Sequence, residues 1–120
     1  DVENLHLNAS NHGFDPYRFL DDLPAGIVEE VHVAGGVTVR DDSLRRPYLA
    51  DSHSQPIPDK TLDLLAYALE RHTPAAVILE RDDRLDAVEE ILDDVMRIRA
   101  RIANAPCGET HAQTTAGSAD

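Results

Sequence analysis

The sequence predicts an α/β fold in which parallel strands are covered by helices on their outer side. Short runs of β-branched and aliphatic residues alternate with longer segments whose apolar residues recur every three or four positions. The run at 75–80 is apolar almost throughout, which is typical of a parallel strand buried on both faces. Because strands that alternate with helices build parallel sheets with outer helices, these observations together indicate this class.

The first third of the chain is expected to hold two strands and one short helix. Residues 1–7 resemble the end of a strand. Asp15 followed by Pro16 is typical of a helix start, so a short helix is predicted through Leu20. Residues 27–34 are rich in β-branched residues and are closed by two glycines, which predicts a second strand.

The remainder of the chain is expected to add two strands and two helices. Residues 38–46 are charged and lack periodicity, so they are predicted to form a loop, and 47–53 a short third strand. Apolar residues at helical spacing predict helices over 60–71 and 85–102, on either side of the fourth strand, 75–80. In the last helix acidic residues come first and arginines follow, which suits the helix dipole.

The domain organisation is predicted to be one folded unit over residues 1–104 and a disordered polar tail over 105–120. A complete (β/α)8 barrel needs about 250 residues, so the chain has room for about half of a TIM-type barrel. The single cysteine, Cys107, falls in the tail and is interpreted as a surface thiol.

The charge of the chain argues against two classes of partner. The formal net charge is −12, from 23 acidic and 11 basic side chains, which would repel a nucleic-acid backbone or an anionic membrane. The sequence has no apolar run long enough to span a bilayer and no targeting segment. We therefore expect a cytoplasmic protein that binds neither nucleic acid nor membrane.

Polar residues at the ends of the predicted strands suggest a metal site. The carboxyl ends of barrel strands surround the active site, and side chains two apart on a strand share a face. The candidate ligands on this rim are Asp1, His32, Asp51, His53 and Glu80. Carboxylates and imidazoles suit iron, manganese or zinc, whereas the absence of thiolates argues against a structural zinc or iron–sulfur site.

Each of these signals also has a structural interpretation. The Asp51–His53 pair can cap a turn, and His32 can be a core histidine with satisfied hydrogen bonds. Asp82 or Asp83 can cap the last helix, and this interpretation is favoured for Asp83. Separate strand ends that all finish in a potential ligand nevertheless favour the metal site.

Several segments together resemble the multinuclear non-heme iron-dependent oxidases, whose best-known members act in methanobactin biosynthesis. Their order and spacing match the C-terminal half of that family's barrel over about residues 1–103. The matching segments are 1–4, Asn8, 11–16 (Asn-His-Gly-Phe-Asp-Pro), 30–35 (Glu-Val-His-Val-Ala-Gly), 51–53 (Asp-Ser-His) and 78–82.

The resemblance implies a function, a cofactor and partners. The activity would be the iron- and oxygen-dependent oxidation of a cysteine in a ribosomally made precursor peptide. Partners would be that peptide, an upstream half-barrel or a second copy, and a protein that recognises the leader peptide. The site would hold two or three iron ions on Asp1, His32, Asp51, His53 and Glu80, with Asn4 and Asp82 as supporting catalytic residues.

Two features depart from the family pattern and leave alternatives open. The upstream half of the barrel, with its further ligands, is absent from these residues, and the segment 36–50 is longer and more charged. One alternative is a divalent-metal barrel enzyme that isomerises sugars or cleaves phosphoesters. The other is a non-catalytic half-barrel that serves as a subunit or binding module.

Overall fold

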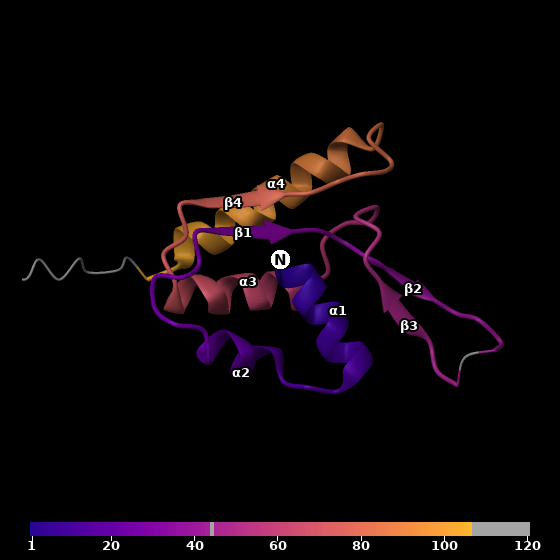
Figure 1. Cartoon of the computed structure of the whole chain (residues 1–120). Coiled ribbons are helices and arrows are strands. Elements are labelled where there is room, and N and C mark those ends of the chain that lie inside the picture. Colours follow the sequence, from indigo (N-terminus) through magenta and orange to yellow (C-terminus); the bar gives the residue numbers. More distant parts are fainter. Residues whose placement is uncertain (44, 107–120) are drawn as a thin grey trace, which may run out of the picture.

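The computed structural model describes residues 1–43 and 45–106. Most of the predicted tail, with Cys107, lies outside the described residues. Within them no helix is both long and apolar enough to cross a membrane. The elements, in chain order, are α1 (Val2–His12), α2 (Pro16–Asp21), β1 (Glu30–Val33), β2 (Val37–Val39), β3 (Tyr48–Ala50), α3 (Asp59–Arg71), β4 (Ala76–Leu79) and α4 (Val88–Asn104) (Figure 1).

The strands β1 and β4 form a parallel pair, so the predicted mixed α/β fold with parallel strands is confirmed. Their register runs from Glu30 opposite Ala76 to Val33 opposite Leu79. The side chains alternate, since Val31 and Val33 are buried while Glu30 is exposed. One face of the pair therefore joins the core. The other carries Glu30 and His32 on β1 and the 37% exposed Ile78 on β4, so the expectation that the run at 75–80 is buried on both faces was wrong.

The opening segment is a helix, and the prediction of a strand at its start was wrong. Asp1 is the N-cap of α1, and its carboxylate accepts the Asn4 backbone N–H at 2.8 Å. The helix ends at Gly13, whose φ of 78° is the left-handed conformation that favours glycine. Capping signals at both ends therefore outweigh the short apolar alternation that resembled a strand.

The hairpin formed by β2 and β3 also differs from expectation. The predicted loop 38–46 begins inside strand β2, and the predicted third strand, 47–53, is reduced to β3. β3 pairs antiparallel with β2, with Thr38 opposite Leu49, so it does not enter the parallel sheet. Among the described residues that sheet contains two strands.

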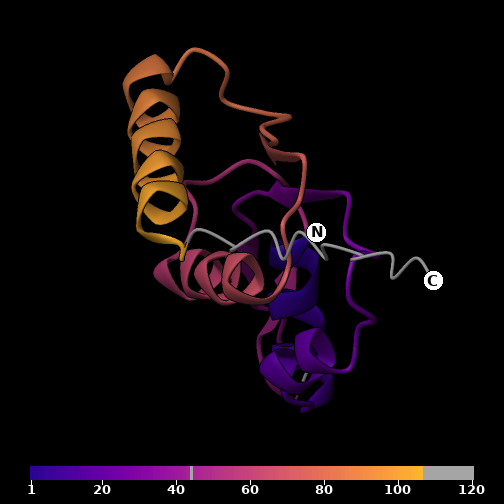
Figure 2. The ribbon, with the colours of Figure 1, turned by 90° about the vertical axis from the view of Figure 1, so that its left-hand side faces the viewer.

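The core lies between the parallel pair and the helices, with α3 at its centre. Leu62, Leu64 and Leu65 of α3 are almost fully buried, and they cluster with Val33 of β1 and Ile98 of α4. Figure 2 shows α3 and α4 on the same side of the two strands. The predicted helix over 60–71 is thereby confirmed, with its apolar face toward β1.

The last helix begins later than the periodicity suggested. It starts at Val88 with Ala87 as N-cap, and no side chain caps it. The favoured role of Asp83 as the cap is therefore wrong. Asp83 instead accepts the backbone N–H of Arg84, whose φ of 53° turns the chain before the helix starts.

Candidate functional site

The loop that follows β3 is held against the end of β1 by two glycines. The carbonyl of Gly35 accepts the backbone N–H groups of Ser54 and Gln55 at 3.0 and 3.1 Å. A Cβ at Gly35 would lie 2.1 Å from the Gln55 carbonyl oxygen, and one at Gly36 would lie 2.5 Å from that of Ala50. Only glycine allows this close approach of two backbones.

The same loop is fixed to the end of β4 on its other side. The backbone N–H of Asp82 donates to the carbonyl of His53 at 2.9 Å, and that of Glu80 donates to the carbonyl of Val33, also at 2.9 Å. The ends of β1 and β4 and the loop after β3 therefore meet at one place. Side chains that are distant in the sequence converge there.

His53 is at the centre of this convergence. Its Nδ1 lies 3.1 Å from Asp82 Oδ2 and 3.6 Å from Glu80 Oε2, and its Nε2 lies 2.8 Å from Asp51 Oδ1. The side chain is 18% exposed. Its backbone φ is 46°, a left-handed conformation that costs a non-glycine residue about 1–2 kcal/mol. Strained residues of this kind cluster at functional sites.

The Nε2 atom of His53 is buried and has no hydrogen-bond partner among the described residues. The nearby Asp51 oxygen is close enough, but it does not lie in the direction that a hydrogen bond requires. Two ligand atoms that bind one metal ion at about 2.1 Å and at right angles are about 3 Å apart. The Asp51–His53 pair therefore has the spacing of two ligands that share a cation.

His32 lies between two carboxylates on the exposed face of β1. Its Nε2 is 3.0 Å from Glu30 Oε1, and its Nδ1 is 2.9 Å from Glu80 Oε1. The hydrogen bond to Glu30, followed by that to Glu80, raises the pKa of His32 above its ordinary value of 6.5. His32 is therefore a partly exposed histidine held by acids, and the interpretation as a core histidine was wrong.

The start of α1 completes the cluster. Asn4 donates from Nδ2 to Asp51 Oδ2 at 3.1 Å, and ligand atoms of Asp1, Asp51 and His53 all lie within 4.8 Å of one another. Contacts thus connect all seven residues predicted for the site, although metal binding by them stays a prediction. With Glu30, we call the group the strand-end cluster: Asp1, Asn4, Glu30, His32, Asp51, His53, Glu80 and Asp82.

Comparison with known proteins agrees with the resemblance seen in the sequence. Residues 1–103 match the family model described as the RiPP precursor modification enzyme MbnB/TglH/ChrH. The chain belongs to this family. The match covers the expected extent, from the N-cap of α1 to the last turns of α4, and it includes every residue of the strand-end cluster.

Bacterial relatives of the family support the assignment. A UPF0276 protein of Caulobacter vibrioides is 39% identical over 103 residues, which cover 86% of this chain and 35% of the relative. A UPF0276 protein of Streptomyces avermitilis is 40% identical over 105 residues, which cover 88% of this chain and 20% of the relative. Another, of Bordetella parapertussis, is 38% identical over 103 residues, which cover 86% of this chain and 35% of the relative. The chain thus spans about a third, or less, of the length of these relatives.

Glu30 is one residue that the sequence interpretation of this family member missed. It precedes His32 by two positions on β1, so both side chains point to the same face. The spacing that linked Asp51 to His53 would have found it.

Glu3 is a second missed residue, and it lies beneath the cluster. Its side chain is 1% exposed, accepts the Gly36 N–H at 2.8 Å, and accepts the hydroxyl hydrogen of Thr61. Burial raises the pKa of Glu3 above 4.5. The carboxyl group ties α1 to α3 and to the glycine turn, so it holds Asp1 and Asn4 in place.

An internal ion network supports the other side of the site in this family member. Asp94 of α4 is fully buried and accepts hydrogen bonds from Ile57 N at 3.1 Å, Arg81 Nη2 at 3.0 Å and Arg97 Nη1 at 3.1 Å. Arg81, between Glu80 and Asp82 in the chain, also donates to the carbonyl of Ser54. We call Arg81, Asp94 and Arg97 the Arg81–Asp94 cluster.

Proposed function

We propose that the chain forms part of an iron-dependent oxidase that modifies a cysteine of a ribosomally made precursor peptide. The observation that carries the proposal is the buried Nε2 of His53, unpaired beside the Asp51 carboxylate within a family of peptide-modifying enzymes. A histidine nitrogen and a carboxylate oxygen at this spacing suit a transition metal.

The residues of the strand-end cluster have distinct roles in this proposal. Two or three iron ions would be held by Asp1, His32, Asp51, His53 and Glu80. Bound iron would supply the redox chemistry with dioxygen that side chains lack.

Asp82 and Asn4 orient two of these ligands. Asp82 accepts a hydrogen bond from the Nδ1–H of His53, which leaves Nε2 with a free lone pair beside Asp51. Asn4 donates to one oxygen of Asp51, so the other oxygen, 2.8 Å from His53 Nε2, remains for a cation. Both contacts fix ligand geometry before a metal arrives.

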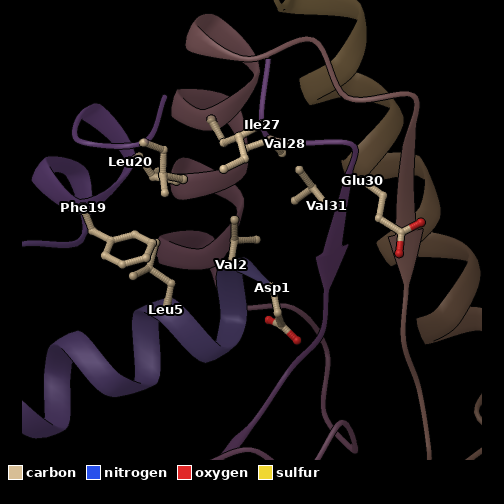
Figure 3. Close-up of a pocket in the computed structure, with 11 residues that line it drawn as sticks. Asp1, Val2, Leu5, Phe19, Leu20, Ile27, Val28, Glu30 and Val31 are labelled. Carbon is tan, nitrogen blue, oxygen red and sulfur yellow. The ribbon is translucent and has the colours of Figure 1, made fainter. Parts of the chain in front are cut away.

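We further propose that additional polypeptide completes a half-barrel into a full TIM-type barrel, as an upstream half or a second copy. Among the described residues β1 pairs only with β4, so its other edge is open. Beside that edge is an apolar pocket of about 310 Å³, with Phe19 and Val28 in its wall and Asp1 and Glu30 at one end (Figure 3). Open edges and apolar hollows of this kind favour association.

The remaining parts of the proposal concern location and recognition. A cytoplasmic location suits a precursor peptide made on ribosomes. A separate leader-recognition protein is proposed as a partner by analogy with the family.

A divalent-metal hydrolase or isomerase is the alternative function. The cluster is rich in carboxylates, namely Asp1, Glu30, Asp51, Glu80 and Asp82, and such oxygen donors also suit manganese and magnesium. Turnover that needs no dioxygen would favour this alternative.

Iron binding by matched variants tests the proposal. The chain is reconstituted with ferrous iron without oxygen, desalted, and its iron measured by mass spectrometry for the parent, Asp51→Ala, His53→Ala and the control Glu89→Gln, an exposed acid on α4. We expect both cluster variants to lose most of the bound iron and the control to retain it. Iron content unchanged in both cluster variants would refute the proposal.

Activity requires a second measurement. Oxygen uptake by the iron-loaded parent is followed after a cysteine-containing peptide is added. The measurement is repeated with the same peptide in which serine replaces the cysteine. We expect uptake only with cysteine. Equal uptake with both peptides would contradict oxidation of a thiol.

A further inference from the structure

The hairpin β2–β3 carries a group of positive charge in an otherwise acidic protein. A pocket of about 380 Å³ lies between the end of α1 and the base of the hairpin, lined by Asn11, His12, Arg45, Arg46 and Tyr48. Three of these residues can carry positive charge, and none is acidic. The whole chain has a net charge of −12, so such a concentration of cationic groups is unusual for it.

The two arginines of this pocket differ from the six arginines of the described residues that form ion pairs, and Arg40 and Arg99, which lie outside the pocket, also form none. Among the described residues, neither Arg45 nor Arg46 forms an ion pair, even though the sequence has 23 acidic residues. Ion pairs to carboxylates are made by Arg18, Arg71, Arg81, Arg84, Arg97 and Arg101. The pocket therefore presents guanidinium groups that form no ion pair within this part of the protein, not even with Asp41 and Asp42 of the same hairpin.

The pocket is a built feature and is fixed to α1 at two points. The Asn11 side chain accepts the Leu49 N–H at 2.9 Å and donates to the Leu49 carbonyl at 2.8 Å. Arg46 donates from Nη2 to the carbonyl of Asn11. These contacts hold the base of the hairpin against the last turn of the helix, so Arg45 and His12 are held on adjacent segments.

The pocket and the strand-end cluster lie along the same two elements. Asn4 contacts Asp51 just after β3, and Asn11 contacts Leu49 within it, so α1 runs beside this strand. From Asp1 to His12 the helix rises about 16 Å, and from Asn4 to Asn11 about 10 Å. An extended peptide covers these lengths with about three to five residues, at roughly 3.3 Å each.

We propose that this pocket binds an acidic segment of the substrate peptide, three to five residues from the residue that reaches the strand-end cluster. The inference rests on the proposed peptide-modifying function and adds the substrate feature that the chain recognises. Arginine forks bind carboxylates through paired, charge-assisted hydrogen bonds, and arginine clusters recur in the recognition of acidic peptide motifs. A nucleic acid fits less well because the negative field of the whole protein repels a long polyphosphate more strongly than a peptide segment with a few carboxylates.

Binding of a labelled peptide by the metal-free chain tests the proposal. The probe is a fluorescein-labelled peptide with one cysteine, a four-residue Gly/Ala spacer and an Asp-Glu pair, and the matched peptide has Asn-Gln in place of that pair. Fluorescence anisotropy gives Kd for the parent, Arg45→Gln, Arg46→Gln and the control Arg99→Gln, an exposed arginine on α4.

We expect the acidic peptide to bind the parent at least about tenfold more tightly than the neutral one, and Arg45→Gln to remove that preference. Arg99→Gln should leave it intact. Because Arg46 also supports the hairpin, Arg45→Gln is the decisive variant. Equal affinity for the two peptides, or the same small effect from Arg45→Gln and Arg99→Gln, would overturn the proposal.

Two further arms separate the alternatives. Inorganic phosphate that displaces the acidic peptide at a concentration near the peptide's own Kd would overturn the assignment to a peptide. Since the assay contains no iron, it is independent of the iron measurement. Arg45-dependent binding in a chain that binds no iron would retain the peptide pocket and reject the oxidase, and the opposite pair of results would reject the pocket alone.

Discussion

The strand-end cluster and the Arg81–Asp94 cluster meet at residues 80–82, and they differ in how their carboxylates are compensated. In the Arg81–Asp94 cluster the Asp94 carboxylate is surrounded by two guanidinium groups and a backbone N–H, and its side chain is 1% exposed. In the strand-end cluster the carboxylates of Asp51, Glu80 and Asp82 share the imidazole of His53, Glu80 also contacts His32, and no arginine or lysine pairs with them. The first cluster is electrostatically complete, whereas the second has an excess of negative charge that a cation would balance.

The difference teaches which acids maintain the fold and which are available for chemistry. A carboxylate that is buried in its charged form needs compensating charge, which Arg81 and Arg97 supply to Asp94, so Asp94 is expected to be structural. The strand-end carboxylates are more exposed and repel one another, which is unfavourable for stability but suitable for metal binding. Variants of each cluster should therefore affect different measurements.

The largest expected effect is the loss of stability in Asp94→Ala. Removing one partner of a buried ion network leaves Arg81, which is 4% exposed, without its main counter-charge, at a cost of about 3–5 kcal/mol. Urea denaturation measures this free energy of unfolding, with Asp93→Ala on the exposed face of α4 as the control. A cost below about 1 kcal/mol would mean that the two clusters are not as different as their contacts indicate.

The second prediction concerns metal and stability in the strand-end cluster. Ferrous iron at 100 times its Kd should stabilise the parent by about 2.7 kcal/mol, since it binds the folded chain selectively. The thermal midpoint measured with and without iron should rise in the parent and stay constant in His53→Ala. An equal rise in both would place the bound iron elsewhere.

A third prediction concerns Glu3, which combines features of both clusters. It is buried, as Asp94 is, but it has no arginine or lysine partner, as the strand-end carboxylates have none. Glu3→Ala should cost about 1–3 kcal/mol, since the Gly36 N–H and the Thr61 hydroxyl lose their acceptor. Glu3→Gln is nearly isosteric and should be tolerated.

The stability of the parent and of Glu3→Gln should depend on pH in different ways. The pKa of Glu3 is raised in the folded chain, so the stability linked to its protonation is present below 4.5 and is lost as pH rises through the folded value. Glutamine does not titrate, so Glu3→Gln should gain stability relative to the parent between pH 4.5 and 7. The free energy of unfolding of both proteins is measured by urea denaturation at several pH values. If the advantage of Glu3→Gln over the parent stays constant or shrinks between pH 4.5 and 7, the pKa of Glu3 is not raised in the folded chain.

The smallest predicted effect is a gain. His53→Gly removes left-handed strain of roughly 1–2 kcal/mol, against an entropic cost of glycine of roughly 0.5–1 kcal/mol. The metal-free variant should therefore be more stable than the parent by up to about 1.5 kcal/mol, while iron binding is lost. Stability that falls instead would show that the contacts of His53 to Asp51 and Asp82 hold the fold together.

Local patterns in the sequence were sufficient for the regular elements of the parallel unit. The β-branched run around Val31 and the apolar run around Ile78 gave the two paired strands, and the spacing of Leu62 and Leu65 gave α3. The pairing of β3 with β2 was missed because it depends on a partner that a charged, irregular segment concealed. The helix at the start was missed because its cap, Asp1, also suits a strand end.

The candidate site divides in the same way. Asp51 and His53 were found because a spacing of two residues places them together, and strand ends suggested His32 and Glu80. Glu3 and Asp94 could not be found, since their partners lie 58 and 37 residues away, at Thr61 and Ile57. Polar groups that are compensated by distant partners leave no local pattern.

The N-cap of α1 links helix formation to whatever the cluster binds. One oxygen of Asp1 accepts the Asn4 N–H at 2.8 Å, while a ligand atom of the same residue lies within 4.8 Å of ligand atoms of Asp51 and His53. A cation that draws charge from this carboxylate would weaken the capping bond. With a diamagnetic cation such as Zn²⁺ in the site, the amide proton of Asn4 should then shift upfield and exchange faster in nuclear magnetic resonance spectra, which makes it a reporter of loading within the backbone itself.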